Sequence, residues 1–331
     1  MTEIIPGIYQ LQIPIPNNPL ENTNVYLLRG DDGYLMIDAG WNSERALNSL
    51  EEQLTEIGIS LDDIYQIVIT HTHADHYGLV GRLKESTQVN ISLHYLEENL
   101  LAFRTGGMEE FMRRTEQWFH CNGVPPEAFP TSRMTPAERR RSNNTTMPDN
   151  TLHGEDTIST GIFNLEVFWT PGHSPGHICL YERKEKILFT GDHVLPGITP
   201  NISLQPQSED NPLGDFLNSL STLKQLEVNM VLPAHEHIFT DLRARIDEII
   251  LHHKYRISEI TGTIESGPKT AYQISDGITW MPDFGGIQFM DLTPWTRRMA
   301  VSETLAHLKA MEVEGKVNKF TEDGIIYYRY N

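Results

Sequence analysis

The sequence predicts a mixed fold of the α+β class, with a large domain and a small one. Apolar segments of strand length, rich in β-branched and aromatic residues, each run into a histidine or an aspartate: residues 64–70, 167–170, 187–190 and 230–232. An amphipathic helical pattern occurs at residues 42–57. Hydrophobic residues make up 39% of the 331 residues, which supports a packed core. We therefore expect a scaffold whose strands deliver polar side chains from their ends.

The densest cluster of polar side chains is the run from His71 to His76, directly after the apolar residues 64–70. It contains three histidines and Asp75, whereas the whole chain has 14 histidines in 331 residues, so chance does not explain the spacing. The β-branched segment before it is typical of a buried strand, and loops at strand ends often carry chemistry. Imidazole and carboxylate groups are ligands of Zn²⁺ and related divalent ions. The run therefore predicts a metal site.

Three further strand ends repeat this arrangement, with Gly or Pro beside each polar residue to form a tight turn. The complete set of candidate ligands is His71, His73, Asp75, His76, His173, Asp192 and His235. Seven ligands are too many for one tetrahedral ion and suit two ions that share a bridging carboxylate. The pattern thus predicts a dinuclear metal centre assembled from several strand ends.

The segments around the histidine run have local signals of their own. A strand is expected at residues 8–13, followed by a hairpin. Ser43 is a suitable N-cap for the helix at residues 42–57, whose apolar side chains recur every three or four positions. After the run, the pattern predicts the start of a helix at residues 77–83 and a strand at residues 89–94.

Residues 96–150 form an insertion between the first ligand cluster and the next. Its first part has a helical pattern, and its second part is rich in proline and contains the arginine run 139–141. Because its ends join ligand-bearing segments, we expect it to overhang the site as a lid. Its large apolar side chains are Phe103, Met108, Phe111, Met112, Trp118 and Phe119. We expect most of these to pack the insertion onto the domain, and one or two to face the substrate.

From about Asp241 the pattern becomes helical, and the chain ends in a predicted hairpin. The expected helices are at residues 242–253, 271–275 and 301–314, and the hairpin strands at residues 316–320 and 325–330. This is the element order of a winged-helix domain. Residues 251–331 contain nine Lys or Arg and ten Asp or Glu, so they lack the basic face that binds phosphate groups. A role in packing or in a homodimer is expected instead.

The composition argues against several classes of protein. No stretch of about 18 apolar residues occurs, so we expect no transmembrane helix and no membrane partner. The first residues lack the basic and apolar regions of a secretory signal, and Cys121 and Cys179 are too isolated for a disulfide framework. A cytoplasmic location is therefore expected. The net charge of −19 disfavours binding to nucleic acid.

Four motifs follow one another along the chain: His-x-His-x-Asp-His at residues 71–76, Gly-His-x-Pro-Gly-His at 172–177, Gly-Asp at 191–192 and Pro-Ala-His at 233–235. In this order they resemble the motifs of the metallo-β-lactamase superfamily, in its glyoxalase-II and lactonase-like branch. The resemblance covers about residues 5–240. It implies an αββα sandwich with a dinuclear metal centre at one edge, formed by a catalytic domain of residues 1–240. Residues 241–331 resemble the small winged-helix-like C-terminal domain of lactamase-like hydrolases and endoribonucleases.

The resemblance also implies a role for each candidate ligand. The first ion would be held by His71, His73 and His173, the second by Asp75, His76 and His235, and Asp192 would bridge the two. Zinc is the expected metal, with iron or manganese as alternatives.

Other polar residues near the motifs are expected to support the site. Asp38 is either a hydrogen-bond partner of a ligand or a turn residue. His177 and His193 are expected to be hydrogen-bonded neighbours, and His193 could also reach the substrate. Glu236, where the family usually has glycine, is expected to be a surface residue.

The enzyme implied by the resemblance is a hydrolase that attacks an ester, thioester or lactone carbonyl with metal-bound hydroxide, which Asp75 would orient. The tail does not resemble the all-helical glutathione-binding domain of glyoxalase II, which argues against a glutathione thioester. His73 replaces the glutamate of flavin-partnered di-iron relatives and argues against that branch. Three alternatives stay open: a lactamase-like endoribonuclease, a mononuclear iron dioxygenase acting on persulfides, and a non-enzymatic scaffold.

Overall fold

The computed structural model describes residues 1–106, 108–129, 146–206, 210–280 and 285–331. Contacts divide the chain into two compact units that interleave along the sequence. The first unit comprises Met1–Gly106, Met134–Pro200 and Thr222–Arg245, and the second comprises Gly107–Arg133, Asn201–Ser221 and Ile246–Asn331. All the candidate ligands belong to the first unit. The continuous domains expected from the sequence, 1–240 and 241–331, stay a prediction.

The first unit contains a seven-stranded sheet whose strands lie side by side in sequence order. They are β1 (Thr2–Ile5), β2 (Ile8–Pro14), β3 (Asn22–Gly30), β4 (Gly33–Ile37), β5 (Ile64–Val68), β6 (Asn90–His94) and β7 (Asn150–Leu152). Neighbours from β1 to β4 are antiparallel, whereas β4, β5, β6 and β7 run parallel to one another. The histidine run follows β5, so it lies at the edge where these parallel strands end. The predicted strands at residues 8–13, 64–70 and 89–94 are confirmed.

The second sheet of this unit has five strands in the order β12-β11-β10-β9-β8. They are β8 (Thr157–Ser159), β9 (Asn164–Trp169), β10 (Ile178–Glu182), β11 (Ile187–Gly191) and β12 (Met230–Pro233). Strand β11 is parallel to β12 and antiparallel to β10, and β10 is antiparallel to β9. Strands β9, β11 and β12 therefore point in the same direction. Their three following loops, which carry His173, Asp192 and His235, consequently lie at one edge of the sheet.

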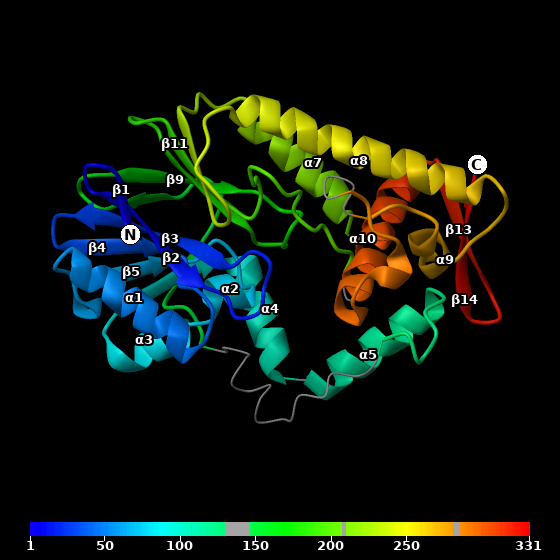
Figure 1. Cartoon of the computed structure of the whole chain (residues 1–331), viewed down its shortest axis with the longest axis horizontal. Coiled ribbons are helices and arrows are strands. Elements are labelled where there is room, and N and C mark those ends of the chain that lie inside the picture. The colour runs from blue at the N-terminus through cyan, green and yellow to red at the C-terminus, as the bar shows by residue number, and fades with distance from the viewer. Residues whose placement is uncertain (107, 130–145, 207–209, 281–284) are drawn as a thin grey trace. The chain divides into compact units, whose positions relative to one another are not determined.

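The two sheets pack face to face, with helices on the outer face of the first sheet (Figure 1). Successive side chains of β3 point to opposite faces of the sheet, so one face packs against the second sheet and the other against the helices. Tyr26 and Leu28 point into a core that also contains Phe189 from the second sheet, whereas Leu27 points to the opposite face and packs with Leu50 of helix α1. The fold is thus a mixed αβ sandwich. Its loops at one edge hold the candidate ligands.

The first unit contains several helices. They are α1 (Glu44–Glu56), a short 3-10 turn (Leu61–Asp63), α2 (Ala74–Tyr77), α3 (Val80–Ser86) and α4 (Tyr95–Gly106). The helix start expected at residues 77–83 is divided between the end of α2 and the beginning of α3. Ser43 caps α1, since its hydroxyl accepts a hydrogen bond from the Ala46 amide at 3.1 Å. The prediction of a capped helix at residues 42–57 is confirmed. Helix α2 begins inside the histidine run and presents Asp75 and His76 from its first turn.

The insertion at residues 96–150 does not form one body. Helix α4 belongs to the first unit, whereas α5 (Met108–Cys121) belongs to the second. Phe119 is buried in the core of the second unit, and Trp118 packs against that core rather than onto the domain that carries the ligands. The arginine run at residues 139–141 and the side chains of Phe103 and Met108 lie outside the described residues. The lid role of the insertion stays a prediction.

The second unit is mainly helical and ends in a hairpin. Its further elements are α7 (Pro212–Leu223) and α8 (Leu242–Ile264), each shared with the first unit, α9 (Ala271–Asp276), a 3-10 turn (Phe289–Asp291), α10 (Pro294–Val313), β13 (Val317–Glu322) and β14 (Ile325–Tyr330). Thr270 caps α9 in a reciprocal capping box with Gln273. The buried core joins α8, α9 and α10 to the hairpin through residues such as Ile260, Ile274 and Leu308. The predicted helices and hairpin are confirmed as elements.

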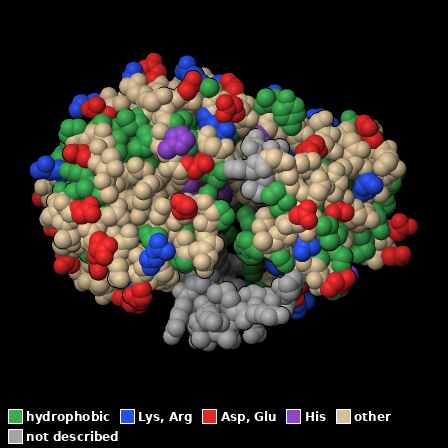
Figure 2. All heavy atoms as spheres, viewed as in Figure 1, with side chains coloured by type: hydrophobic (Ala, Val, Ile, Leu, Met, Phe, Trp, Pro, Cys, Tyr) green, Lys and Arg blue, Asp and Glu red, His purple; other side chains and the backbone are tan. Residues whose placement is uncertain are grey.

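Acidic side chains are scattered over the face shown in Figure 2, where the described Lys and Arg side chains are isolated rather than gathered in a patch. This agrees with the net charge of −19. Among the described residues, no helix is long and apolar enough to cross a membrane.

Candidate metal centre

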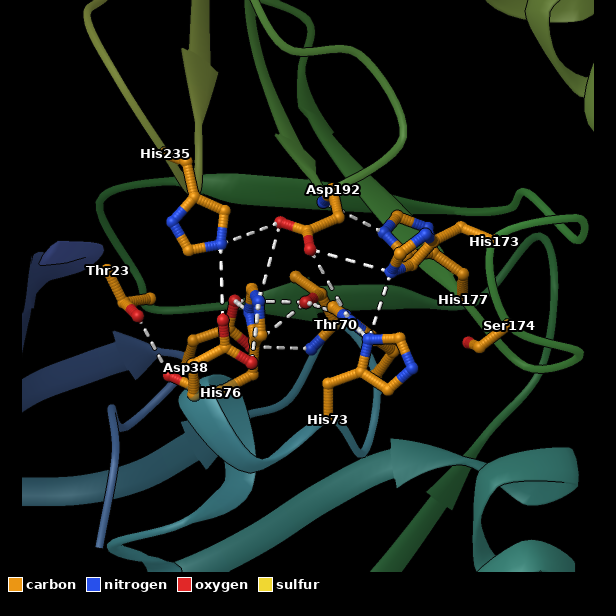
Figure 3. Close-up of polar contacts among 12 residues, drawn as sticks. Thr23, Asp38, Thr70, His73, His76, His173, Ser174, His177, Asp192 and His235 are labelled. Carbon is orange, nitrogen blue, oxygen red and sulfur yellow. Dashed lines mark hydrogen bonds and ion pairs between the residues drawn. The ribbon is translucent and has the colours of Figure 1, made fainter. Parts of the chain in front are cut away.

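The two sheets bring the predicted ligands to one place from separate segments of the chain (Figure 3). The loop after β5 supplies the histidine run, and the loops after β9, β11 and β12 supply His173, Asp192 and His235. The loops are tied together by the backbone, since the Ile178 amide donates to the Thr70 carbonyl at 3.0 Å. All seven predicted ligands therefore lie together, in two groups.

The first group contains His71, His73, His173 and Asp192, whose ligand atoms all lie within 4.8 Å of one another. Nδ1 of His73 lies 2.9 Å from Nε2 of His71 and 3.0 Å from Nε2 of His173. Oδ2 of Asp192 completes the group, at 3.8 Å from His71 Nε2 and 3.5 Å from His173 Nε2. Three imidazole nitrogens and one carboxylate oxygen thus converge, which is a tetrahedral donor set in number and kind.

The second group contains Asp75, His76 and His235, again within 4.8 Å of one another. Oδ2 of Asp75 lies 3.4 Å from Nε2 of His235. The other oxygen of Asp192, Oδ1, lies 3.4 Å from His76 Nε2 and 3.3 Å from His235 Nε2. Asp192 therefore directs one oxygen to each group (Figure 3).

Unsatisfied polar atoms test whether these residues fit a metal. Within the described part of the chain, Nε2 of His76, Nε2 of His235 and Oδ1 of Asp192 are buried and make no hydrogen bond. Buried polar atoms without a partner cost free energy. A divalent cation would satisfy all three atoms at once, since Oδ1 of Asp192 lies 3.4 Å from His76 Nε2 and 3.3 Å from His235 Nε2. The residues fit a divalent metal ion.

In the first group, the charges of the side chains are those of a metal site. Burial and the neighbouring His76 lower the pKa of His71 well below its usual value, and burial together with His173 lowers the pKa of His73 to about 3. These imidazoles are neutral at pH 7, the form that binds a metal. Burial raises the pKa of the Asp192 carboxyl, but His235 and His76 outweigh this effect and hold it well below its usual value. Asp192 is consequently an anion.

The two histidines of the second group are each held by a second contact at the ring nitrogen that faces away from the centre. Nδ1 of His76 lies 2.8 Å from Oδ2 of Asp38, and Asp38 also accepts from the Thr70 amide at 2.8 Å. Nδ1 of His235 lies 3.0 Å from the Asn22 carbonyl. Of the two sequence interpretations of Asp38, partner of a ligand or turn residue, the first is confirmed, although its φ of 61° is also that of a turn. These contacts fix which nitrogen faces the metal.

The neighbours of the ligands differ in part from the prediction. The Asp192 amide donates to His177 Nε2 at 3.2 Å, so His177 is a hydrogen-bonded neighbour, as predicted. Glu236 was expected at the surface; it is exposed, but it also accepts from the amides of Gly197 and Ile198 at 2.8 and 3.2 Å. It therefore ties the loop after Asp192 to the loop after β12.

Sequence reasoning missed one buried polar residue near the site, Glu97. It lies in the first turn of α4, is 0% exposed and accepts hydrogen bonds from residues on both sides of the first group. The available sequence signal was a carboxylate directly after a predicted strand. The role of Glu97 could not be predicted from that signal, because its hydrogen-bond partners are in loops that are distant from it in the sequence.

Comparison with known proteins agrees with this geometry. Residues 18–235 match the family model described as the metallo-beta-lactamase superfamily. The chain is 27% identical over 329 residues to the probable metallo-hydrolase YqjP of Bacillus subtilis (strain 168), covering 97% of each. It is 30% identical over 229 residues to the acyl-coenzyme A thioesterase MBLAC2 of Homo sapiens, covering 65% of this chain and 74% of the relative.

Solved structures extend the similarity to the whole chain. The metallo-beta-lactamase family protein TTHA1429 from Thermus thermophilus superposes with a TM-score of 0.82 at 30% sequence identity, covering 99% of this chain and 100% of that one. This similarity includes the second unit. The fold, the convergent histidines and aspartates, and the match over residues 18–235 lead to one conclusion. The chain belongs to the metallo-beta-lactamase superfamily.

Proposed function

We propose that this chain, a metal-dependent hydrolase of its superfamily, uses two divalent ions to hydrolyse a small acyl substrate, with a thioester as the first candidate and an ester or lactone as alternatives. One observation carries the proposal: the two oxygens of Asp192 face two different ligand groups. The name of the relative MBLAC2, an acyl-coenzyme A thioesterase, supports the choice of a thioester.

The ligand assignment follows the two groups. We propose zinc as the metal, with His71, His73 and His173 at the first ion, Asp75, His76 and His235 at the second, and Asp192 between them. Two such ions, when bound, lower the pKa of water toward ~7 and withdraw electrons from a carbonyl oxygen. The protein supplies the fixed positions, because four of the ligands are buried (His71, His76, Asp192 and His235) and the outer ring nitrogens of His76 and His235 are already hydrogen-bonded.

Asp75 is the proposed catalytic residue. Burial raises the pKa of its carboxyl, but the neighbouring His76 and His235 outweigh this and lower the pKa to about 2. The group is therefore an acceptor at neutral pH. Its backbone is fixed, since the Thr23 hydroxyl donates to the Asp75 carbonyl at 3.0 Å. We propose that Asp75 accepts a hydrogen bond from the attacking water and so sets its direction toward the substrate carbonyl.

The other parts of the chain have supporting roles in this proposal. The order of α8, α9, α10 and the β13–β14 hairpin is that of a winged-helix domain, and we propose that it serves packing or a homodimer. The insertion starts beside the ligand loops of the first unit, because Glu97 of α4 contacts Thr72 and Ser174. We propose that its continuation selects acyl length, so that Phe111→Ala raises KM more for long acyl groups than for short ones.

Elemental analysis together with a substrate panel tests the function. Protein purified without chelator is expected to contain two equivalents of metal and to hydrolyse acyl thioesters, esters or lactones, but neither phosphodiesters nor RNA. Cleavage of single-stranded RNA would support the endoribonuclease alternative. A single iron with oxygen consumption on a persulfide would support the dioxygenase alternative. Either result would contradict the proposed hydrolase.

A further inference from the structure

Glu97 is a buried carboxylate that the proposed chemistry does not use. It lies in the first turn of α4 and is 0% exposed. Among the described ion pairs, none joins it to a lysine or an arginine. Burying an unpaired carboxylate is costly unless hydrogen bonds replace the lost water. Its location therefore calls for an explanation in terms of the groups around it.

Glu97 accepts four hydrogen bonds, two at each oxygen. Oε2 accepts from the Thr72 amide at 2.9 Å and from the Thr72 hydroxyl at 2.6 Å. Oε1 accepts from the Ser174 hydroxyl at 2.7 Å and from the Gly176 amide at 2.9 Å. Each oxygen thus binds a different loop. Thr72 lies between His71 and His73, and Ser174 is the residue after His173.

The loop after β9 is seated closely on the first turn of α4. A Cβ atom at Gly176 would lie 2.7 Å from the Glu97 amide nitrogen and 2.8 Å from its Cγ, so only glycine leaves room for this approach. The contact between Glu97 and this loop is therefore a specific fit. It places the turn that carries His173 at a fixed distance from the helix.

We propose that Glu97 is a positioning residue that ties together the two loops bearing the imidazoles of the first group, and so sets the spacing of His71, His73 and His173 for one metal ion. This inference rests on the proposed function, because it assumes that the site binds metal. All three imidazoles of the first group come from the two loops that Glu97 joins. In the second group, His235 comes from a loop that Glu97 does not touch.

Glu97→Gln is the informative substitution. The glutamine side chain has one acceptor oxygen and one NH₂ group, so it can satisfy one loop but must turn a donor toward the amide of the other. Whichever way it turns, one loop loses its acceptor. Glu98→Gln is the matched control, because Glu98 is in the same helical turn and loses the same charge.

The experiment measures zinc affinity at the first group alone, in a His235→Ala background that removes a ligand of the second group only. Glu97→Gln is expected to weaken zinc binding by a factor on the order of 10, as for other residues that orient metal ligands, and Glu98→Gln to leave it unchanged. Amide hydrogen exchange of metal-free protein should become faster in peptides covering residues 70–77 or 171–178 in Glu97→Gln only.

Unchanged affinity and exchange in Glu97→Gln would overturn the proposal, and so would equal effects in Glu98→Gln. A parent chain that binds no zinc at all would contradict the proposed function instead. If Glu97→Gln fails to fold, Ser174→Ala removes a single donor and keeps the carboxylate. It should weaken zinc binding roughly threefold, since one of the four hydrogen bonds is lost. Wild-type affinity in Ser174→Ala would then overturn the inference.

Discussion

Asp38→Asn tests how the structure selects the metal-binding nitrogen of His76. Asp38 is 1% exposed, its Oδ2 lies 2.8 Å from His76 Nδ1, and its Oδ1 accepts from the Thr70 amide at 2.8 Å. An aspartate here requires the proton of a neutral His76 to be on Nδ1, which leaves Nε2 free to bind metal. An asparagine that keeps the Thr70 contact presents its NH₂ group to Nδ1. It therefore moves the proton of His76 to Nε2, where it blocks the metal.

The expected loss is confined to the second metal. Substituting a partner of a metal ligand typically costs on the order of 10- to 100-fold in affinity, which corresponds to about 1.4–2.7 kcal/mol. The assay is a stepwise zinc titration against a chromophoric chelator. The first equivalent should bind as in the parent chain, because His71, His73 and His173 do not contact Asp38. Turnover should fall in proportion to the occupancy of the second group.

Asp32→Asn is the control, since Asp32 is exposed in the turn between β3 and β4 and the substitution removes the same charge. Both equivalents should bind this variant with parental affinity. If Asp38→Asn binds the second equivalent within a factor of about two of the parent, then Asp38 does not determine the tautomer of His76 and the reasoning is refuted.

Three further predictions follow from the same structure. Asp75→Asn should lower turnover by a factor on the order of 10²–10⁴, while elemental analysis still finds metal in the first group; near-parental turnover with full metal content would exclude the positioning role. Chelation of the metal should lower Tm and added zinc should restore it, because an ion at 100 times its Kd stabilises the fold by about 2.7 kcal/mol; an unchanged Tm would argue against metal in the buried site. Burial lowers the pKa of His307 from 6.5 to about 3. Between these pH values His307 is protonated in the unfolded chain but neutral in the folded chain. The free energy of unfolding is therefore highest above pH 6.5 and falls as the pH drops toward 3, with a loss of about 2 kcal/mol at pH 5. Denaturant unfolding at pH 7.5 and 5 should show a smaller pH dependence for His307→Gln than for the parent, and equal dependence would contradict this.

The sequence indicates the candidate ligands because their signals are local. His71, His73, Asp75 and His76 share one loop, and the strand before them is marked by its β-branched residues. The same strand-then-ligand pattern identifies the remaining candidates. Because β9, β11 and β12 run in the same direction, the loops after them bring His173, Asp192 and His235 to one edge of the sheet.

What the sequence does not predict depends on contacts between distant segments. Glu97 and Gly176 are 79 positions apart, so no periodicity reveals that they meet. Glu236 has the exposure of a surface residue, yet it accepts hydrogen bonds from amides 39 and 38 positions before it in the chain. The insertion shows the same limit, since its helical pattern does not reveal that α4 and α5 belong to different units. Helix propensity is local, whereas unit membership is decided by packing.

In the proposed centre, Asp192 separates two metal ions held by different ligand groups. Anomalous diffraction at the zinc edge, from crystals of the zinc-loaded chain, is the most direct test. Two peaks are expected about 3.5–4 Å apart on either side of Asp192, one next to His73 and the other next to His235. A single peak in fully loaded protein, or a second peak away from Asp75, His76 and His235, would contradict this arrangement.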